Sequence, residues 1–125
     1  MQKLFYRAGA VCYVIWGLLH LEAARNVYAL GSTLDQGMVQ GRVYQDAWNL
    51  VYFAVFAIVV AAVFNWKNSR WGYWLNFVTV GVTDIGFIMV ILVPGHLPLF
   101  PGALGPALWV AGAALTTMGL RGRPE

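Results

Sequence analysis

The 125-residue chain has very little charge. Only 10% of its residues are Asp, Glu, Lys or Arg, whereas 60% are hydrophobic, and its mean hydropathy is +0.65. A soluble domain usually has about 25% charged residues. This shortage indicates that most of the surface does not face water, and the length allows a single domain.

The residues that serve most often as nucleophiles and metal ligands are also scarce. Cys12 is the only cysteine, which excludes an intramolecular disulfide and a thiolate metal cluster. Ser32 and Ser69, the only serines, fall in expected loops. No phosphate-binding glycine loop, HExxH or GxSxG motif occurs. The two histidines lack the spacing of a ligand pair, so we expect neither a metal nor a cofactor.

Four apolar stretches predict an all-α, integral membrane bundle of four transmembrane helices in one domain, residues 1–125. A span needs about 20 predominantly apolar residues. The spans are expected at about 8–24, 46–66, 72–93 and 102–120. Between the first two lies the longest polar segment, which begins at Arg25.

The basic residues predict the orientation of the bundle. Four spans place six of the eight on one side and only Arg25 and Arg42 on the other. By the positive-inside rule, both termini are expected in the cytoplasm. Basic residues in ones and twos beside apolar runs are typical of membrane flanks, so no nucleic-acid partner is expected. The short loops favour a bacterial inner membrane. The six residues are Lys3, Arg7, Lys67, Arg70, Arg121 and Arg123.

Asp84 lies near the middle of the third span, where a carboxylate is costly and normally faces a partner, a cavity or a pathway. His20 and Asp46 lie at the outer ends of the first and second spans. His96 lies in the outer loop between the last two. The sequence therefore predicts a polar pocket open to the outer face, with Asp84 at its floor.

The helix that leads into the second span is expected to carry Arg42, Asp46 and Asn49 on one face. Asp46 is either a site carboxylate oriented by Arg42 or half of a structural i,i+4 ion pair. Asp84 itself is either functional or a structural carboxyl bonded to a neighbouring helix. The predicted catalytic residues are Asp84, His20 and Asp46. The predicted substrate contacts are Asn49, Arg42, Trp16, Tyr13, Trp48, Phe87 and His96.

Titratable groups around an apolar cavity favour a site for a lipophilic small molecule. The first hypothesis is an acid–base enzyme of isomerase, hydrolase or cyclase type, or a binding protein for such a molecule. The second is a proton-coupled transporter acting as a homodimer, with the small residues of the last span at the interface. The third is an accessory subunit of a membrane complex. In each case membrane lipid is a partner.

Overall fold

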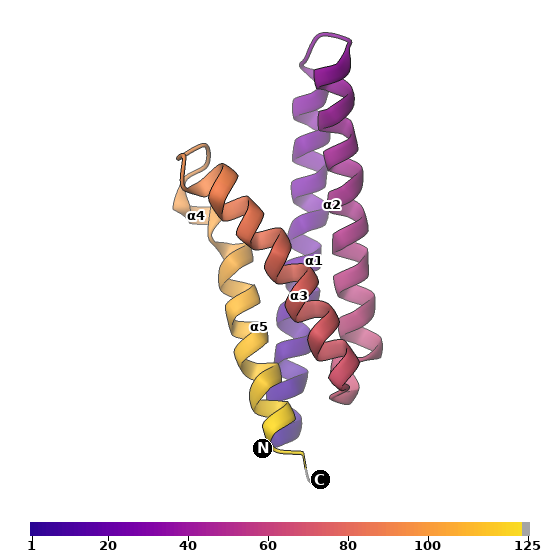
Figure 1. Ribbon diagram of the computed structural model, residues 1–125, viewed down its shortest axis with the longest axis vertical. Helices are drawn as coiled ribbons and strands as arrows, with labels where there is room; N and C mark the ends of the chain where they lie inside the picture. The colour runs from indigo at the N-terminus through magenta and orange to yellow at the C-terminus, as the bar shows by residue number, and fades with distance from the viewer. Residues whose placement is uncertain (124–125) are drawn as a thin grey trace.

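The computed structural model describes residues 1–123, and these residues form an all-α fold (Figure 1). The all-α part of the predicted fold class is therefore confirmed. The elements in chain order are α1 (Gln2–Ser32), α2 (Met38–Val63), the 3₁₀ turn η1 (Asn65–Lys67), α3 (Arg70–Phe87), the π-helical segment η2 (Ile88–Leu92), the short α4 (Leu99–Gly102) and α5 (Leu104–Arg121).

Three helices are long and apolar enough to cross a membrane: Gln2–Ser32, Met38–Lys67 and Arg70–Leu92. This indicates a multi-pass membrane protein. The fourth expected span corresponds to α5, which has 18 residues and is not among the three.

Helix α1 is longer than the sequence predicted. The polar segment expected from Arg25 onward is helical up to Ser32, because no proline or glycine interrupts it before Gly31. With 31 residues, α1 is about 46 Å long, well beyond a hydrocarbon core of about 30 Å. Part of α1 would therefore lie outside the hydrocarbon core of a bilayer that it crossed upright.

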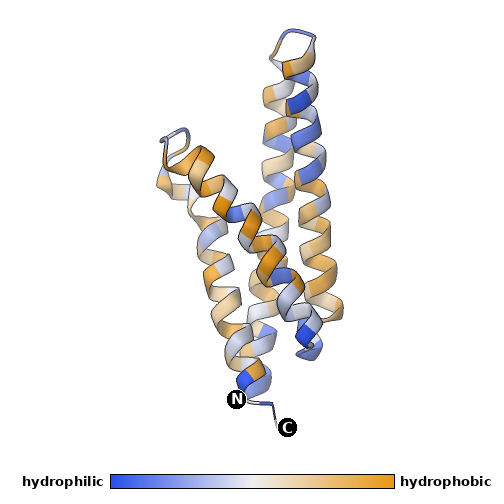
Figure 2. Cartoon of the chain, in the orientation of Figure 1, coloured by the Kyte–Doolittle hydropathy of each residue, from blue (hydrophilic) through white to orange (hydrophobic). Residues whose placement is uncertain are grey.

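Helices α1 and α2 form a long antiparallel hairpin that reaches past the other helices (Figure 1). Helix α5 lies along the first half of α1, and α3 packs against α5 and the end of α2 before it diverges from α2. The chain begins and ends at the same end of the bundle. Hydrophilic residues gather at that end and near the tip of the hairpin (Figure 2).

Three glycines of α5, seven residues apart, lie against three ring-bearing residues of α1 with the same spacing. The pairs are Gly105 with His20, Gly112 with Tyr13 and Gly119 with Tyr6. A methyl group on Gly119 would lie only 2.6 Å from Tyr6 Cβ. Small residues let helix backbones approach closely, so this glycine face holds α5 on α1. The face expected at a dimer interface is thus covered within the same chain.

Polar bonds tie the helices together at the end where the chain begins. Gln2 Nε2 and Asn68 Nδ2 each donate to the Gly119 carbonyl at 2.9 Å. Asn76 Nδ2 donates to the Ala57 carbonyl of α2 at 3.1 Å. These bonds join α1, α2, α3 and α5 at one end, whereas α3 leaves α2 toward the other.

The first prediction concerns the close approach of α5 to α1. A methyl group on Gly9 would lie 2.7 Å from Thr116 Cγ2 and 3.0 Å from its backbone nitrogen, whereas a methyl group on Gly86 would meet nothing within 4 Å. Gly9→Ala should lower the free energy of unfolding by about 1–3 kcal/mol through overpacking. Gly86→Ala should leave it unchanged or raise it by up to about 1 kcal/mol. Unfolding in mixed micelles by titrated SDS measures both, and equal effects would contradict the packing described.

Candidate functional site

The candidate site centres on Asp84, in the last turn of α3. Its carboxylate is fully buried, and the indole Nε1–H of Trp16 donates to both carboxylate oxygens, at 3.1 and 3.0 Å. The two residues are 68 positions apart, so this contact ties α3 to α1. A carboxylate has about four lone-pair sites, and one shared N–H leaves most of them unused. Asp84 therefore keeps the capacity to bind a proton.

His20 lies one helical turn after Trp16, and its Nε2 is 3.8 Å from Asp84 Oδ1. Its Nδ1 is 2.8 Å from the Trp16 carbonyl oxygen. Because a carbonyl only accepts, Nδ1 carries the proton in this bond, which leaves Nε2 facing the carboxylate. The imidazole also stacks on the Trp16 indole, with ring centroids 3.7 Å apart. The orientation of His20 is thus fixed by Trp16.

Gly105, in the first turn of α5, covers this pair. A methyl group there would lie 3.1 Å from His20 Cε1 and 3.7 Å from Asp84 Oδ1. The start of a helix carries a partial positive charge, so α5 places a favourable field beside the carboxylate. Sequence analysis missed Gly105. The signal that could have identified it is the seven-residue spacing that the α5 glycines share with the ring-bearing residues of α1.

The structure does not bring the second predicted carboxylate into this cluster. Asp46 and Asn49 are exposed on α2, and no bond joins either of them to Asp84 in the described part of the chain. Arg42 Nη1 donates to Gln45 Oε1 at 2.8 Å. Within residues 1–123, no ion pair of 4.0 Å or less links Arg42 with Asp46. The face that these residues share points away from the candidate site.

The other predicted contacts are dispersed. Tyr13 is buried one turn before Trp16, and its hydroxyl has no hydrogen-bond partner among the described residues. Phe87 is half-buried at the end of α3. Trp48 is 75% exposed on α2, and His96 is exposed in the turn between η2 and α4. Of the predicted residues, Trp16, His20 and Asp84 are joined by polar contacts and ring stacking, and Tyr13 packs in the same buried cluster as Trp16.

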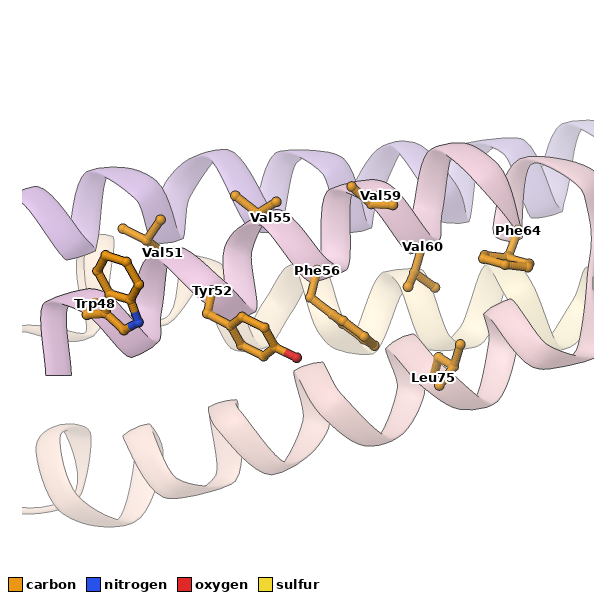
Figure 3. Close-up of a pocket in the computed structure, with 9 residues that line it drawn as sticks. All are labelled: Trp48, Val51, Tyr52, Val55, Phe56, Val59, Val60, Phe64 and Leu75. Carbon is orange, nitrogen blue, oxygen red and sulfur yellow. The ribbon is translucent and has the colours of Figure 1, made fainter. Parts of the chain in front are cut away.

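The expected pocket open to the outer face is closed at Asp84, whose side chain has no exposed surface. A groove of about 560 Å³ lies elsewhere, between α2 and α3 (Figure 3). Neither His20 nor Asp84 lines it. Its lining residues are Trp48, Val51, Tyr52, Val55, Phe56, Val59, Val60, Phe64 and Leu75.

No protein-family model, curated protein or solved structure matches the chain. Over residues 1–123, no group of three or more His, Cys, Asp or Glu side chains is placed to hold a metal ion.

The chemistry of the Asp84–His20 cluster is that of a proton donor and acceptor. A buried carboxylate facing an imidazole nitrogen can hold one proton between the two groups and exchange it.

The second prediction concerns the Trp16–Asp84 bond. Trp16→Phe removes the one hydrogen-bond donor that the buried Asp84 carboxylate has within residues 1–123, and it should lower the free energy of unfolding by about 1.5–3 kcal/mol. Trp109→Phe is the matched control, since Trp109 Nε1 donates to a neutral carbonyl, that of Phe77, at 3.2 Å. Its cost should be about 0.5–1.5 kcal/mol.

A double-mutant cycle with Asp84→Asn isolates the bond from the loss of ring volume. The cost of Trp16→Phe should shrink when position 84 is no longer a carboxylate. Strict additivity of the two changes would show that the Trp16–Asp84 contact does not contribute to stability.

Proposed function

We propose that the protein performs acid–base chemistry on a lipophilic small molecule inside the membrane, as an isomerase, hydrolase or cyclase. The observation that carries this proposal is the buried contact of Asp84 Oδ1 with His20 Nε2 at 3.8 Å. A carboxylate and an imidazole in an apolar bundle are a costly arrangement for structure alone. Positioned groups of these two types are also the commonest general acids and bases.

The two groups have different access to solvent, which supports a division of roles. Asp84 has no exposed side-chain surface, whereas the His20 side chain is 12% exposed. In the proposed mechanism Asp84 exchanges a proton with the substrate, and His20 exchanges that proton with the exterior. Trp16 holds the carboxylate in place through its N–H, so it is a positioning residue.

The surroundings of Asp84 support a lipophilic substrate. The buried core beside it contains Tyr13, Trp16 and Val80. Polar groups that lose water in such a place without gaining a hydrogen bond are strongly disfavoured. A substrate that is mainly hydrocarbon, with one reactive polar or unsaturated centre, suits these walls. It reaches Asp84 only when Gly105 at the start of α5 moves aside.

A four-span topology with both termini in the cytoplasm belongs to the same proposal. If α1, α2 and α3 each cross the membrane, α5 returns the chain to the side where it began (Figure 1). The six basic residues at that end favour the cytoplasmic side. The His20–Asp84 pair then lies in the outer half of the membrane, near the start of α5.

The third prediction tests proton exchange directly. The protein is purified in mild detergent, and the lipophile it retains is identified by native mass spectrometry and extraction. Incubation in D₂O should then place deuterium on carbon in that molecule or in its product. Asp84→Asn should slow this exchange by about 100-fold or more, because general acid–base catalysis contributes about that much.

Asp46→Asn is the matched control, since it makes the same acid-to-amide change on the exposed face of α2. It should leave the exchange rate within about twofold of the unmodified protein. Equal exchange in the unmodified protein and in Asp84→Asn, or retention of bulk lipid alone, would contradict the proposed chemistry.

A proton-coupled carrier is the second candidate, and the sealed carboxylate favours it. Asp84 is shut off from solvent while His20 retains a small exposed edge, as expected of a coupling site that opens to the two sides of the membrane in turn.

The fourth prediction concerns transport into proteoliposomes with an imposed pH gradient. Tetraphenylphosphonium uptake should depend on the gradient and be lost in Asp84→Asn but not in Asp46→Asn. Uptake that is independent of the gradient would exclude coupling at Asp84.

A further inference from the structure

The groove between α2 and α3 is separate from the Asp84 site and has its own character. Its walls are apolar and aromatic side chains, nearly all from one face of α2, with Leu75 of α3 opposite them (Figure 3). From Trp48 to Phe64 it follows 17 residues, which corresponds to a rise of about 24 Å along the helix axis. Such a groove is long, narrow and apolar, which are the properties of a site for a hydrocarbon chain.

The turn that joins α2 to α3 lies beside one end of the groove. Phe64, which lines this end and is the C-cap of α2, accepts backbone hydrogen bonds from Lys67 at 3.1 Å and Ser69 at 3.0 Å. Gly72 packs so closely that a methyl group on it would lie 2.6 Å from Phe64 Cβ. The backbone of the turn that carries Lys67 and Arg70 therefore packs against Phe64, at the end of the groove.

Two basic side chains of this turn have no polar partner among residues 1–123. Of the basic residues at this end of the bundle, Arg7 lies over the Trp66 ring at 5.1 Å, and Arg123 Nη1 donates to the Asn68 carbonyl at 3.1 Å. Lys67 and Arg70 are exposed, and neither side chain makes a hydrogen bond or ion pair within residues 1–123. The start of α3 adds the positive end of a helix dipole beside them.

We propose that the groove is a binding site for an anionic phospholipid. One acyl chain lies along α2 from Phe64 toward Trp48, and the phosphate of the headgroup lies against Lys67 and Arg70. Charge complementarity selects the headgroup, because each basic side chain near a membrane surface attracts anionic lipid. The apolar walls select a chain, because burying hydrocarbon surface is favourable in proportion to its area. Trp71, 74% exposed, stands at the headgroup level as interfacial tryptophans do.

The same charges disfavour a second copy of the chain in the groove. A two-fold axis along the membrane normal places identical ends of two copies together. An interface at this groove would bring Lys67 and Arg70 toward the same cations of the other copy. A phosphate avoids this repulsion and neutralises the charge.

The experiment is native mass spectrometry of the protein exchanged into detergent with equal phosphatidylglycerol and phosphatidylcholine. The unmodified chain should retain one phosphatidylglycerol in clear preference. The double variant Lys67→Gln/Arg70→Gln should lower that retention by about tenfold or more, since two surface charges are lost. The matched pair Lys3→Gln/Arg121→Gln removes equal charge at the same end of the bundle, away from the groove, and should change retention less than twofold.

Val59→Trp fills the groove from a half-exposed position of α2, and it should reduce retention of both lipids while leaving the far-UV circular dichroism unchanged. Soluble glycerol phosphate should not displace the lipid. The proposal is overturned by equal retention of the two lipids, by equal losses in the two charge pairs, or by displacement with glycerol phosphate. A dimer that Val59→Trp dissociates would overturn it too, by making the groove a protein interface. None of these outcomes depends on Asp84, so this test is separate from that of the acid–base chemistry.

Discussion

The bond from the Trp16 indole to the Asp84 carboxylate determines how the helices meet. A carboxylate inside an apolar bundle needs a donor, and the only one it has in residues 1–123 comes from α1. This fixes the rotation of both α1 and α3. The same rotation brings His20 beside the carboxylate, because it lies one turn further along α1. It also leaves little room above the pair, since a methyl group on Gly105 would lie 3.1 Å from His20 Cε1 and the ring would have to shift slightly.

The bundle is held in different ways at its two ends. Near the chain terminus, side-chain amides such as those of Gln2, Asn68 and Asn76 bond to backbone carbonyls of neighbouring helices. Toward the other end, α3 diverges from α2 and keeps its contact with α1 through Asp84 (Figure 1). The divergence that opens the apolar groove on one side of α3 therefore makes the carboxylate contact on its other side more important for the position of that helix.

The structure brings together only some of the residues that the sequence singles out, and the reasons are physical. Asp84 and His20 stand out because ionisable residues in apolar helices are costly, and Trp16 follows from its position one turn before His20. Asp46 and Asn49 were placed in the site because the rotation of α2 was unknown. That helix is apolar on every side, so its hydrophobic pattern does not show which face is buried. The sequence shows that α5 is rich in small residues. Only the tertiary structure shows that this face packs against α1 of the same chain.

The contacts around Asp84 differ in the free energy that is needed to break them. Among the described residues, no hydrogen bond joins the first turn of α5 to His20 or Asp84, so lifting this turn loses van der Waals contacts and part of the favourable field of the helix start. Moving Trp16 away would instead leave a buried carboxylate without its donor, which costs far more. Further along, α5 stays anchored to α3 by the bond from Trp109 to the Phe77 carbonyl. The helix start is therefore the least costly route to Asp84, while α1 and α3 keep the carboxylate and the imidazole in register.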